Sequence, residues 1–258
     1  MSTTLVLMLA GALGLIMGSA VTAIVWRVPR GISWLTGRSA CPSCKTPLGV
    51  LDLVPLLSFA FSRGRCRHCG APIAWRYPLT ELWCAAWAVL LVLRTGLWPW
   101  TPLLAVWGFL LVALTWIDYD HKLLPDVLTF PGTLIGLAST LLQPGGIQRA
   151  LFGLLVGAGG LWLVAWLYFR VRKIEGMGGG DIKLAAMFGV VLGAPLTLLT
   201  LFLAAAAGSL WGGILMLRGQ AHGRTELPFG TLLAPAAMIA LLYGDAWIRA
   251  YLGLMKHP

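Results

Sequence analysis

Long uncharged, apolar runs alternate with short polar segments along the whole chain. A helix needs about 20 apolar residues to cross a hydrocarbon core roughly 30 Å thick. Six runs without Asp, Glu, Lys or Arg reach or approach this length, at residues 2–26, 98–117, 127–148, 150–169, 184–217 and 227–244. The pattern therefore predicts a protein that crosses a membrane several times.

The longest run, 184–217, is too long for one ordinary helix and contains the break signal Gly193-Ala194-Pro195. We interpret it as two passes, the first of them short. A further span is expected at 79–97, although Glu81 and Arg94 lie near its ends. The sequence thus predicts an all-α polytopic membrane protein with about eight transmembrane helices, at 2–26, 79–97, 102–117, 127–142, 150–169, twice within 184–217, and at 227–247.

The composition excludes a soluble globular domain, because 59% of the residues are hydrophobic and 11% are charged, against roughly 45–50% and 25% in soluble proteins. The net charge of +10 raises the question of nucleic acid. In the eight-pass arrangement, however, fifteen of the nineteen lysines and arginines fall on one side of the membrane, which the positive-inside bias identifies as the cytoplasm. Topology and contact with anionic headgroups of the lipid bilayer therefore explain the basic excess, and nucleic acid is not an expected partner.

The largest polar segment, 27–78, is the candidate for a small cytoplasmic domain between a first transmembrane helix at 1–26 and a transmembrane core at 79–258. It holds two C-x-x-C pairs separated by 21 residues, Cys41 with Cys44 and Cys66 with Cys69. Each pair can present two thiolates to one ion from a single tight turn, and tetrahedral zinc takes four ligands. The spacing predicts a structural zinc ribbon, because disulfides are rare in the cytoplasm. A redox or disulfide role and reduced, unliganded thiols remain as alternatives.

Carboxylates are scarce, since the chain has nine acidic residues in all, and placing them near lipid depth costs a few kcal/mol each. Asp118, Asp120 and Asp126 directly follow the third predicted span, and Asp181 precedes the sixth. Both segments fall on the cytoplasmic side, so one carboxylate from each can meet at the membrane face. An aspartyl protease needs such a pair, one group to deprotonate a water and the other to donate a proton to the scissile carbonyl.

Three glycines, Gly178, Gly179 and Gly180, directly precede Asp181. Glycine can take backbone angles that are closed to other residues, and it leaves room for a neighbouring chain. We expect this loop to let a peptide strand approach Asp181 closely. The helix that follows is expected to place its positive N-terminal end near the same carboxylate.

Two other classes of membrane protein share some of these features. A secondary transporter also uses carboxylates and broken helices, and the break near Pro195 fits one. The cysteine pairs and the lack of an internal repeat argue against it. A membrane thiol-disulfide protein would use the four cysteines as redox centres, but it would leave the aspartates unexplained.

Five motifs occur in one order along the chain: Gly18-Ser19 with Arg27-Val28-Pro29, the cysteine segment 41–81, the first aspartate segment 117–126, the glycine-aspartate segment 178–184, and Pro228-Phe229-Gly230. In this order they closely resemble the type IV prepilin leader peptidases, membrane aspartyl proteases with a G-x-G-D motif. Many members of that family are also N-methyltransferases. The chain departs from the family at Ala20-Val21-Thr22 and at Leu53-Val54, where the family carries asparagines.

The resemblance implies that Asp118 and Asp181 are the catalytic pair and that Asp126 is an accompanying acidic residue. It implies cleavage of type IV prepilins or pseudopilins after a glycine, on the cytoplasmic side of the bacterial inner membrane. It also implies N-methylation of the new terminus with S-adenosylmethionine, although no glycine-rich nucleotide loop marks a site for this cofactor. A homo-oligomer is compatible with the sequence, which carries no signal for or against one.

Overall fold

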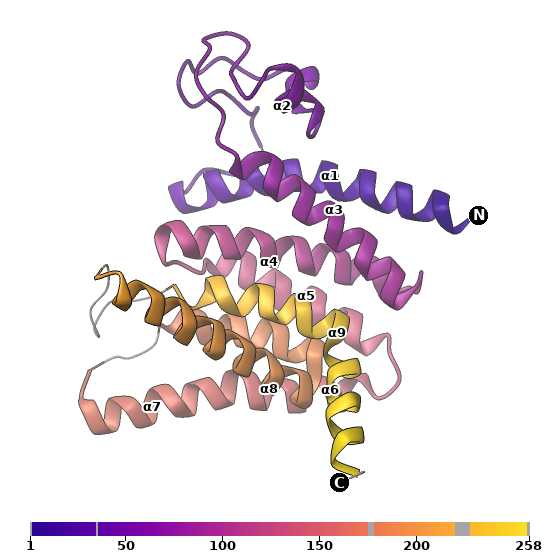
Figure 1. Cartoon of the computed structure of the whole chain (residues 1–258), viewed down its shortest axis with the longest axis vertical. Coiled ribbons are helices and arrows are strands. Elements are labelled where there is room, and N and C mark those ends of the chain that lie inside the picture. The colour runs from indigo at the N-terminus through magenta and orange to yellow at the C-terminus, as the bar shows by residue number, and fades with distance from the viewer. Residues whose placement is uncertain (1, 35, 175–177, 220–227, 257–258) are drawn as a thin grey trace. The chain divides into compact units, whose positions relative to one another are not determined.

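The computed structural model describes residues 2–34, 36–174, 178–219 and 228–256. Within these ranges the regular structure is helical, with two isolated β-bridges and no β-strand. The chain divides into two compact units, Met1–Thr101 and Pro102–Pro258, and Figure 1 shows the order of their elements. Each unit is built around its own set of packed helices.

The N-terminal unit pairs two long helices, α1 (Thr3–Arg27) and α3 (Arg76–Thr95), which lie next to each other in Figure 1. Gly14 and Gly18, four residues apart, make the contact close. A Cβ at Gly14 would lie 2.6 Å from Ala85 Cα, and one at Gly18 would lie 2.5 Å from Glu81 Cα. Small residues at this spacing let transmembrane helices approach backbone to backbone. The segment between the helices carries η1 (Val28–Arg30), η2 (Val50–Leu53) and the short helix α2 (Leu57–Phe61).

The C-terminal unit is built from α4 (Thr101–His121), α5 (Asp126–Leu141), α6 (Gly146–Leu154), α7 (Gly160–Arg172), α8 (Gly179–Leu217) and α9 (Gly230–Lys256). A π-helical turn, η3 (Leu155–Gly159), joins α6 to α7, so these three elements form one continuous span. The first half of α8 is buried among its neighbours. This half of α8 is the central element of the C-terminal unit.

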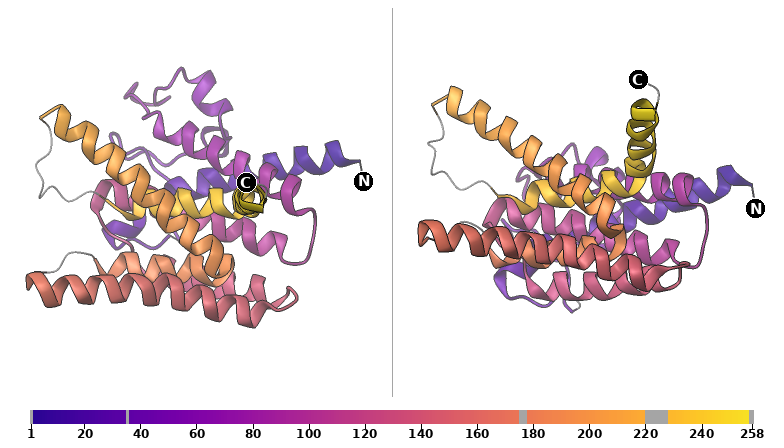
Figure 2. Two further views of the ribbon diagram at one scale, coloured as in Figure 1. Left: turned by 60° about the horizontal axis from the view of Figure 1, so that its bottom comes forward. Right: turned by 90° about the horizontal axis from the view of Figure 1, so that it is seen from below.

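Helix α8 breaks where the sequence predicted it. Gly193 has φ 72° and ψ 175°, a conformation that favours glycine, and Pro195 follows two residues later. The chain turns back at this point, so that the two halves of α8 run in opposite directions (Figures 1 and 2). A Cβ at Gly193 would also lie 2.8 Å from Arg149 Cγ. The structure thus confirms the predicted break.

Side-chain hydrogen bonds fix the first half of α8, which carries Asp181. Trp107 Nε1 on α4 donates to Met187 O at 3.1 Å, and Thr140 Oγ1 on α5 donates to Val190 O at 3.0 Å. Gly153 on α6 lies so close to the Gly189 carbonyl that a Cβ would not fit. Donors and close packing from three helices therefore hold the start of α8 in place.

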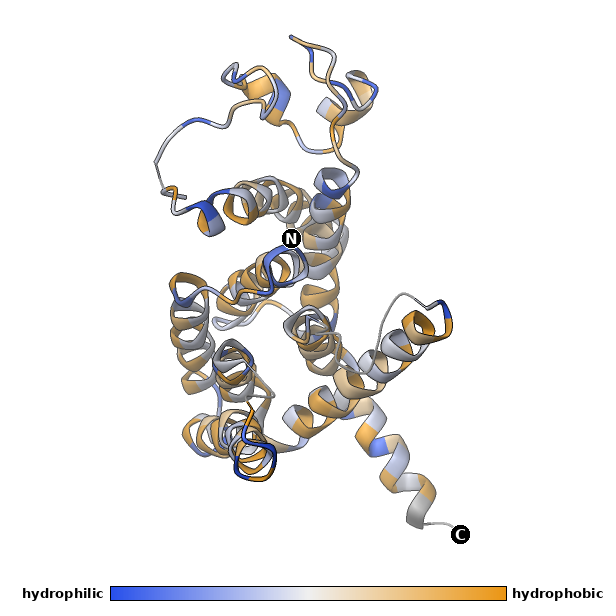
Figure 3. Ribbon diagram, turned by 90° about the vertical axis from the view of Figure 1, so that its left-hand side faces the viewer, coloured by the Kyte–Doolittle hydropathy of each residue, from blue (hydrophilic) through white to orange (hydrophobic). Residues whose placement is uncertain are grey.

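In the part of the chain that the structure describes, six helices are long and apolar enough to cross a membrane, and α5 is a shorter apolar helix. Large apolar side chains are exposed along them, among them Leu5, Met8, Leu9, Leu13 and Ile16 on α1 and Trp162, Leu163, Val164 and Leu167 on α7. Figure 3 shows the hydrophobic residues along the helices and many of the hydrophilic ones in loops and at helix ends. These features confirm an all-α, multi-pass membrane protein. A count of eight passes remains a prediction, and the expected start of the last span at residue 227 lies outside the described residues.

Candidate active site

Asp118 lies in the last turn of α4, not in the loop after it as the sequence suggested. The apolar run ends at Ile117, but the helix continues to His121 because the polar residues of its last turn can still form backbone hydrogen bonds. Asp118 is 5% exposed, whereas Asp120, two residues further, is exposed. The helix therefore turns Asp118 inward and Asp120 outward.

Asp181 is the third residue of α8, and it is partly buried. The expectation of unusual backbone angles before it was wrong: Gly178 is the N-cap with φ −70° and ψ 140°, and Gly179 and Gly180 are helical. Lack of space explains one of the three glycines, Gly180. A Cβ at Gly179 would meet nothing within 4 Å, whereas one at Gly180 would lie 3.0 Å from Leu124 Cβ.

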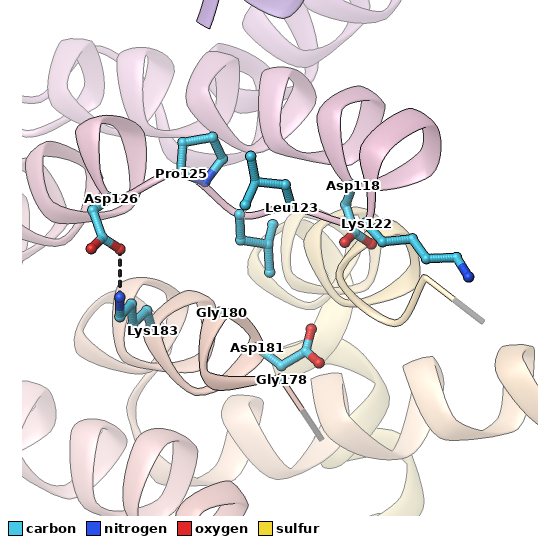
Figure 4. A pocket seen from close by; sticks show the side chains of 10 residues that line it. Asp118, Lys122, Leu123, Pro125, Asp126, Gly178, Gly180, Asp181 and Lys183 are labelled. Carbon is cyan, nitrogen blue, oxygen red and sulfur yellow. Dashed lines mark hydrogen bonds and ion pairs between the residues drawn. The ribbon is translucent and has the colours of Figure 1, made fainter. Parts of the chain in front are cut away.

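Asp118 and Asp181 line one pocket of about 390 Å³. Figure 4 shows the two side chains projecting into it from different helices, α4 and α8. The walls are completed by Lys122, Leu123, Leu124, Pro125, Asp126, Gly178, Gly180 and Lys183. Two sequence segments that lie far apart thus meet at one open pocket, as an aspartyl pair requires.

Asp118 accepts hydrogen bonds from Thr231, a residue that the sequence pattern did not mark. Thr231, the second residue of α9, donates its backbone N–H to Asp118 Oδ2 at 2.6 Å and its hydroxyl to the same oxygen at 2.9 Å. Gly230 precedes it, and a Cβ there would lie 3.0 Å from the Asp118 carboxylate and from Leu124 Cδ1. The motif Pro228-Phe229-Gly230 marked the start of this helix, but it ended one residue too early to include the contact.

Asp126 forms an ion pair with Lys183. Its Oδ1 lies 2.6 Å from Lys183 Nζ, and both side chains are about half exposed, 54% and 46%. This ion pair joins the first turn of α5 to the start of α8 (Figure 4). Asp126 therefore connects the two aspartate segments at the pocket wall.

The four cysteines of the N-terminal unit lie in two knuckles that repeat with an offset of 25 residues. Cys41 N–H donates to Thr46 O at 3.0 Å, and Cys66 N–H donates to Ala71 O at 2.8 Å. Each knuckle closes with an isolated β-bridge, Ala40 with Pro47 and Arg65 with Pro72. Equivalent turns thus present both C-x-x-C pairs.

The ligand atoms of Cys41, Cys44, Cys66 and Cys69 all lie within 4.8 Å of one another, and the Cys41 and Cys69 sulfurs are 3.9 Å apart. Four sulfurs at about 2.3 Å from a tetrahedral zinc stand at nearly this separation. Hydrogen bonds from the Thr46 side chain and then its backbone lower the pKa of the Cys44 thiol to about 6. A lowered pKa favours the thiolate, the form that binds metals.

Known protein families match both units of the chain. The bacterial Peptidase A24 N-terminal domain matches residues 12–95, which include the four cysteines. The type IV leader peptidase family matches residues 103–213, which include Asp118 and Asp181. No solved structure matches the chain.

Several curated relatives are similar over most of the chain, and three of them, each named prepilin leader peptidase/N-methyltransferase, serve as examples. The protein from Aeromonas hydrophila is 43% identical over 221 residues, which cover 83% of this chain and 74% of the relative. Those from Pseudomonas aeruginosa and Burkholderia pseudomallei are each 36% identical over 270 residues. They cover 93% and 94% of this chain and 91% and 87% of their own lengths.

Proposed function

This chain belongs to the type IV leader peptidase family, and we propose that it is an aspartyl endopeptidase that removes the leader from type IV prepilins or pseudopilins by cutting after a glycine. The observation that carries this proposal is the meeting of Asp118 and Asp181 at one pocket. We propose that these two aspartates are the catalytic pair.

The reaction needs one carboxylate and one carboxylic acid. The carboxylate takes a proton from a water as the water oxygen bonds to the scissile carbonyl carbon, while the acid donates its proton to the carbonyl oxygen. When the C–N bond breaks, the leaving nitrogen takes the proton that the first aspartate took from the water. One hydroxyl of the tetrahedral intermediate returns its proton to the other aspartate, and the carbonyl is restored as a carboxyl group. Two aspartates at one pocket, with no further group in the reaction, can carry out both steps.

The position of the pocket suits a substrate whose cleavage site adjoins a hydrophobic helix. Asp118 lies at the end of the candidate span Thr101–His121 and Asp181 at the start of the candidate span Gly179–Leu217. A substrate helix in the bilayer would bring its polar leader to this edge. The distribution of lysine and arginine favours the cytoplasmic side for the pocket and the cysteine knuckles.

We further propose that the four cysteines hold a structural zinc ion. The donor set fits zinc, since four sulfur ligands meet within tetrahedral reach. Zinc would cross-link the two knuckles and so order the polar segment that carries them. It takes no part in the peptidase step.

The relatives' name also supports a second activity, N-methylation of the new pilin terminus, with S-adenosylmethionine as the methyl donor. Methyl transfer to an amine needs a free amine and an aligned donor, and the aspartyl pair has no part in it. No residue of this chain is assigned to that cofactor.

The proposal is tested by cleavage of a purified prepilin in detergent, with the cut identified by mass spectrometry. Wild-type enzyme should release the leader with glycine at its new carboxyl end. Intact substrate, or a cut at another residue, would contradict the proposed specificity.

A further inference from the structure

Thr231 makes the closest described contacts to Asp118, although the two residues are 113 positions apart. Its backbone N–H and its hydroxyl both reach Oδ2, at 2.6 and 2.9 Å. The Thr231 hydroxyl also lies 3.4 Å from Thr115 O. Because a hydroxyl has one proton, the shorter and charge-assisted contact to the carboxylate is favoured.

We propose that Thr231 is a positioning residue for the peptidase reaction, which holds Asp118 Oδ2 and thereby directs Oδ1 toward the water and the scissile bond. This inference rests on the proposed role of Asp118. A carboxylate with two donors on one oxygen cannot rotate freely about its Cβ–Cγ bond. Proton transfer depends on such alignment, because reacting atoms that are misplaced by about 1 Å can lose about a hundredfold in rate.

The two donors of Thr231 differ in whether a side-chain substitution can remove them. The backbone N–H belongs to the first turn of α9, where amide groups point away from the helix without partners of their own and carry partial positive charge. No side-chain substitution at Thr231 except proline removes it. The hydroxyl is the adjustable donor, and it is the one that mutation can test.

Gly230 provides a second observation for the same arrangement. A Cβ at this position would lie 3.0 Å from Asp118 Cγ and Oδ2 and 3.0 Å from Leu124 Cδ1. These separations are tighter than ordinary van der Waals contact, so a larger residue would displace the carboxylate. The start of α9 is thus shaped to abut Asp118, with a residue lacking a side chain next to one that donates twice.

The test compares Thr231→Ala with Thr231→Ser, which differ by one hydroxyl, and adds Thr231→Val, which keeps the shape of threonine. A hydrogen bond to a charged group is worth enough that kcat of the Ala and Val variants should fall about tenfold to a hundredfold, with KM within about threefold. Thr231→Ser should stay within about threefold of wild type. Thr200→Val is the control, since it removes a threonine hydroxyl that lies outside the pocket and donates within α8 to Leu196 O at 2.8 Å.

Rates are measured per folded enzyme, with the folded amount taken from size-exclusion chromatography in detergent. If the Val variant does not fold, the ratio of the Ser to the Ala variant still decides the question. Equal kcat in the Ala and Ser variants would overturn the positioning role, as would a loss that appears in KM alone. Asp118→Asn separates this failure from failure of the proposed function: an inactive Asp118→Asn beside a fully active Thr231→Ala would contradict only the inference about Thr231.

Discussion

The ion pair between Asp126 and Lys183 allows a sharp prediction, because Asp126 lies at the pocket and yet has a partner of its own. If Asp126 serves only to connect α5 with α8, removing its charge should affect stability and leave the chemistry intact. If it belongs to the reaction, the rate should collapse. The variants Asp126→Asn and Lys183→Met, with the double variant, separate these two roles.

The expected energies are small. The pair is short, at 2.6 Å, but its side chains are 54% and 46% exposed, and solvated ion pairs contribute about 0–1 kcal/mol. Asp126 is also the first residue of α5, where a negative charge contributes about 0.3–1 kcal/mol. Asp126→Asn loses both contributions, about 0.3–2 kcal/mol, and Lys183→Met loses only the pair, about 0–1 kcal/mol.

The assay follows thermal unfolding in detergent together with the rate of prepilin cleavage. We expect a coupling energy of at most about 1 kcal/mol from the double-mutant cycle, decreasing as salt is added. The value of kcat should stay within about fivefold of wild type for all three variants, since 1 kcal/mol corresponds to about that factor. A fall in kcat of a hundredfold or more in Asp126→Asn, at an unchanged unfolding temperature, would refute the reasoning and place Asp126 in the chemistry.

Two further predictions concern the other proposed functions. Purified protein should contain about one zinc ion per chain by elemental analysis, and serine at Cys41 or Cys66 should remove it and loosen the knuckle segment to proteolysis; metal-free protein isolated without chelators would contradict the zinc assignment. Asp181→Asn enzyme, given pre-cleaved pilin and S-adenosylmethionine, should still add a methyl group, detected by mass spectrometry as about 14 Da, because the carboxyl pair acts on the peptide bond and not on the amine. An unmodified terminus with wild-type enzyme would reduce the protein to a peptidase alone.

The sequence predicted the elements whose physical signal is local. The break at Gly193 followed from a glycine and a proline in an overlong apolar run, and the cysteine cluster followed from ligand spacing. The end of α4 was not predicted from the sequence. The apolar run ends at Ile117, whereas the helical backbone hydrogen bonds continue through Asp118. Helix ends are set by those bonds and not by polarity.

The sequence also did not predict the contacts between segments that lie far apart in the chain. Thr231 reaches Asp118 only because α9 begins against the end of α4, and nothing in the local pattern around residue 231 marks a donor. The pairing of Asp126 with Lys183 depends likewise on how α5 and α8 pack. A sequence signal was available for the knuckles, whose repeat of 25 residues joins cysteine to cysteine and the closing proline to proline.

The most direct test of the central claim is the rate of prepilin cleavage by Asp118→Asn and Asp181→Asn, measured side by side with Asp120→Asn in detergent. An amide can neither deprotonate water nor donate the shared proton, so each of the first two variants should lose about a thousandfold or more of kcat while remaining folded. Asp120→Asn, which changes an exposed carboxylate in the same turn of α4 as Asp118, should cleave at close to the wild-type rate. Near wild-type cleavage by a folded Asp118→Asn or Asp181→Asn enzyme would contradict the account.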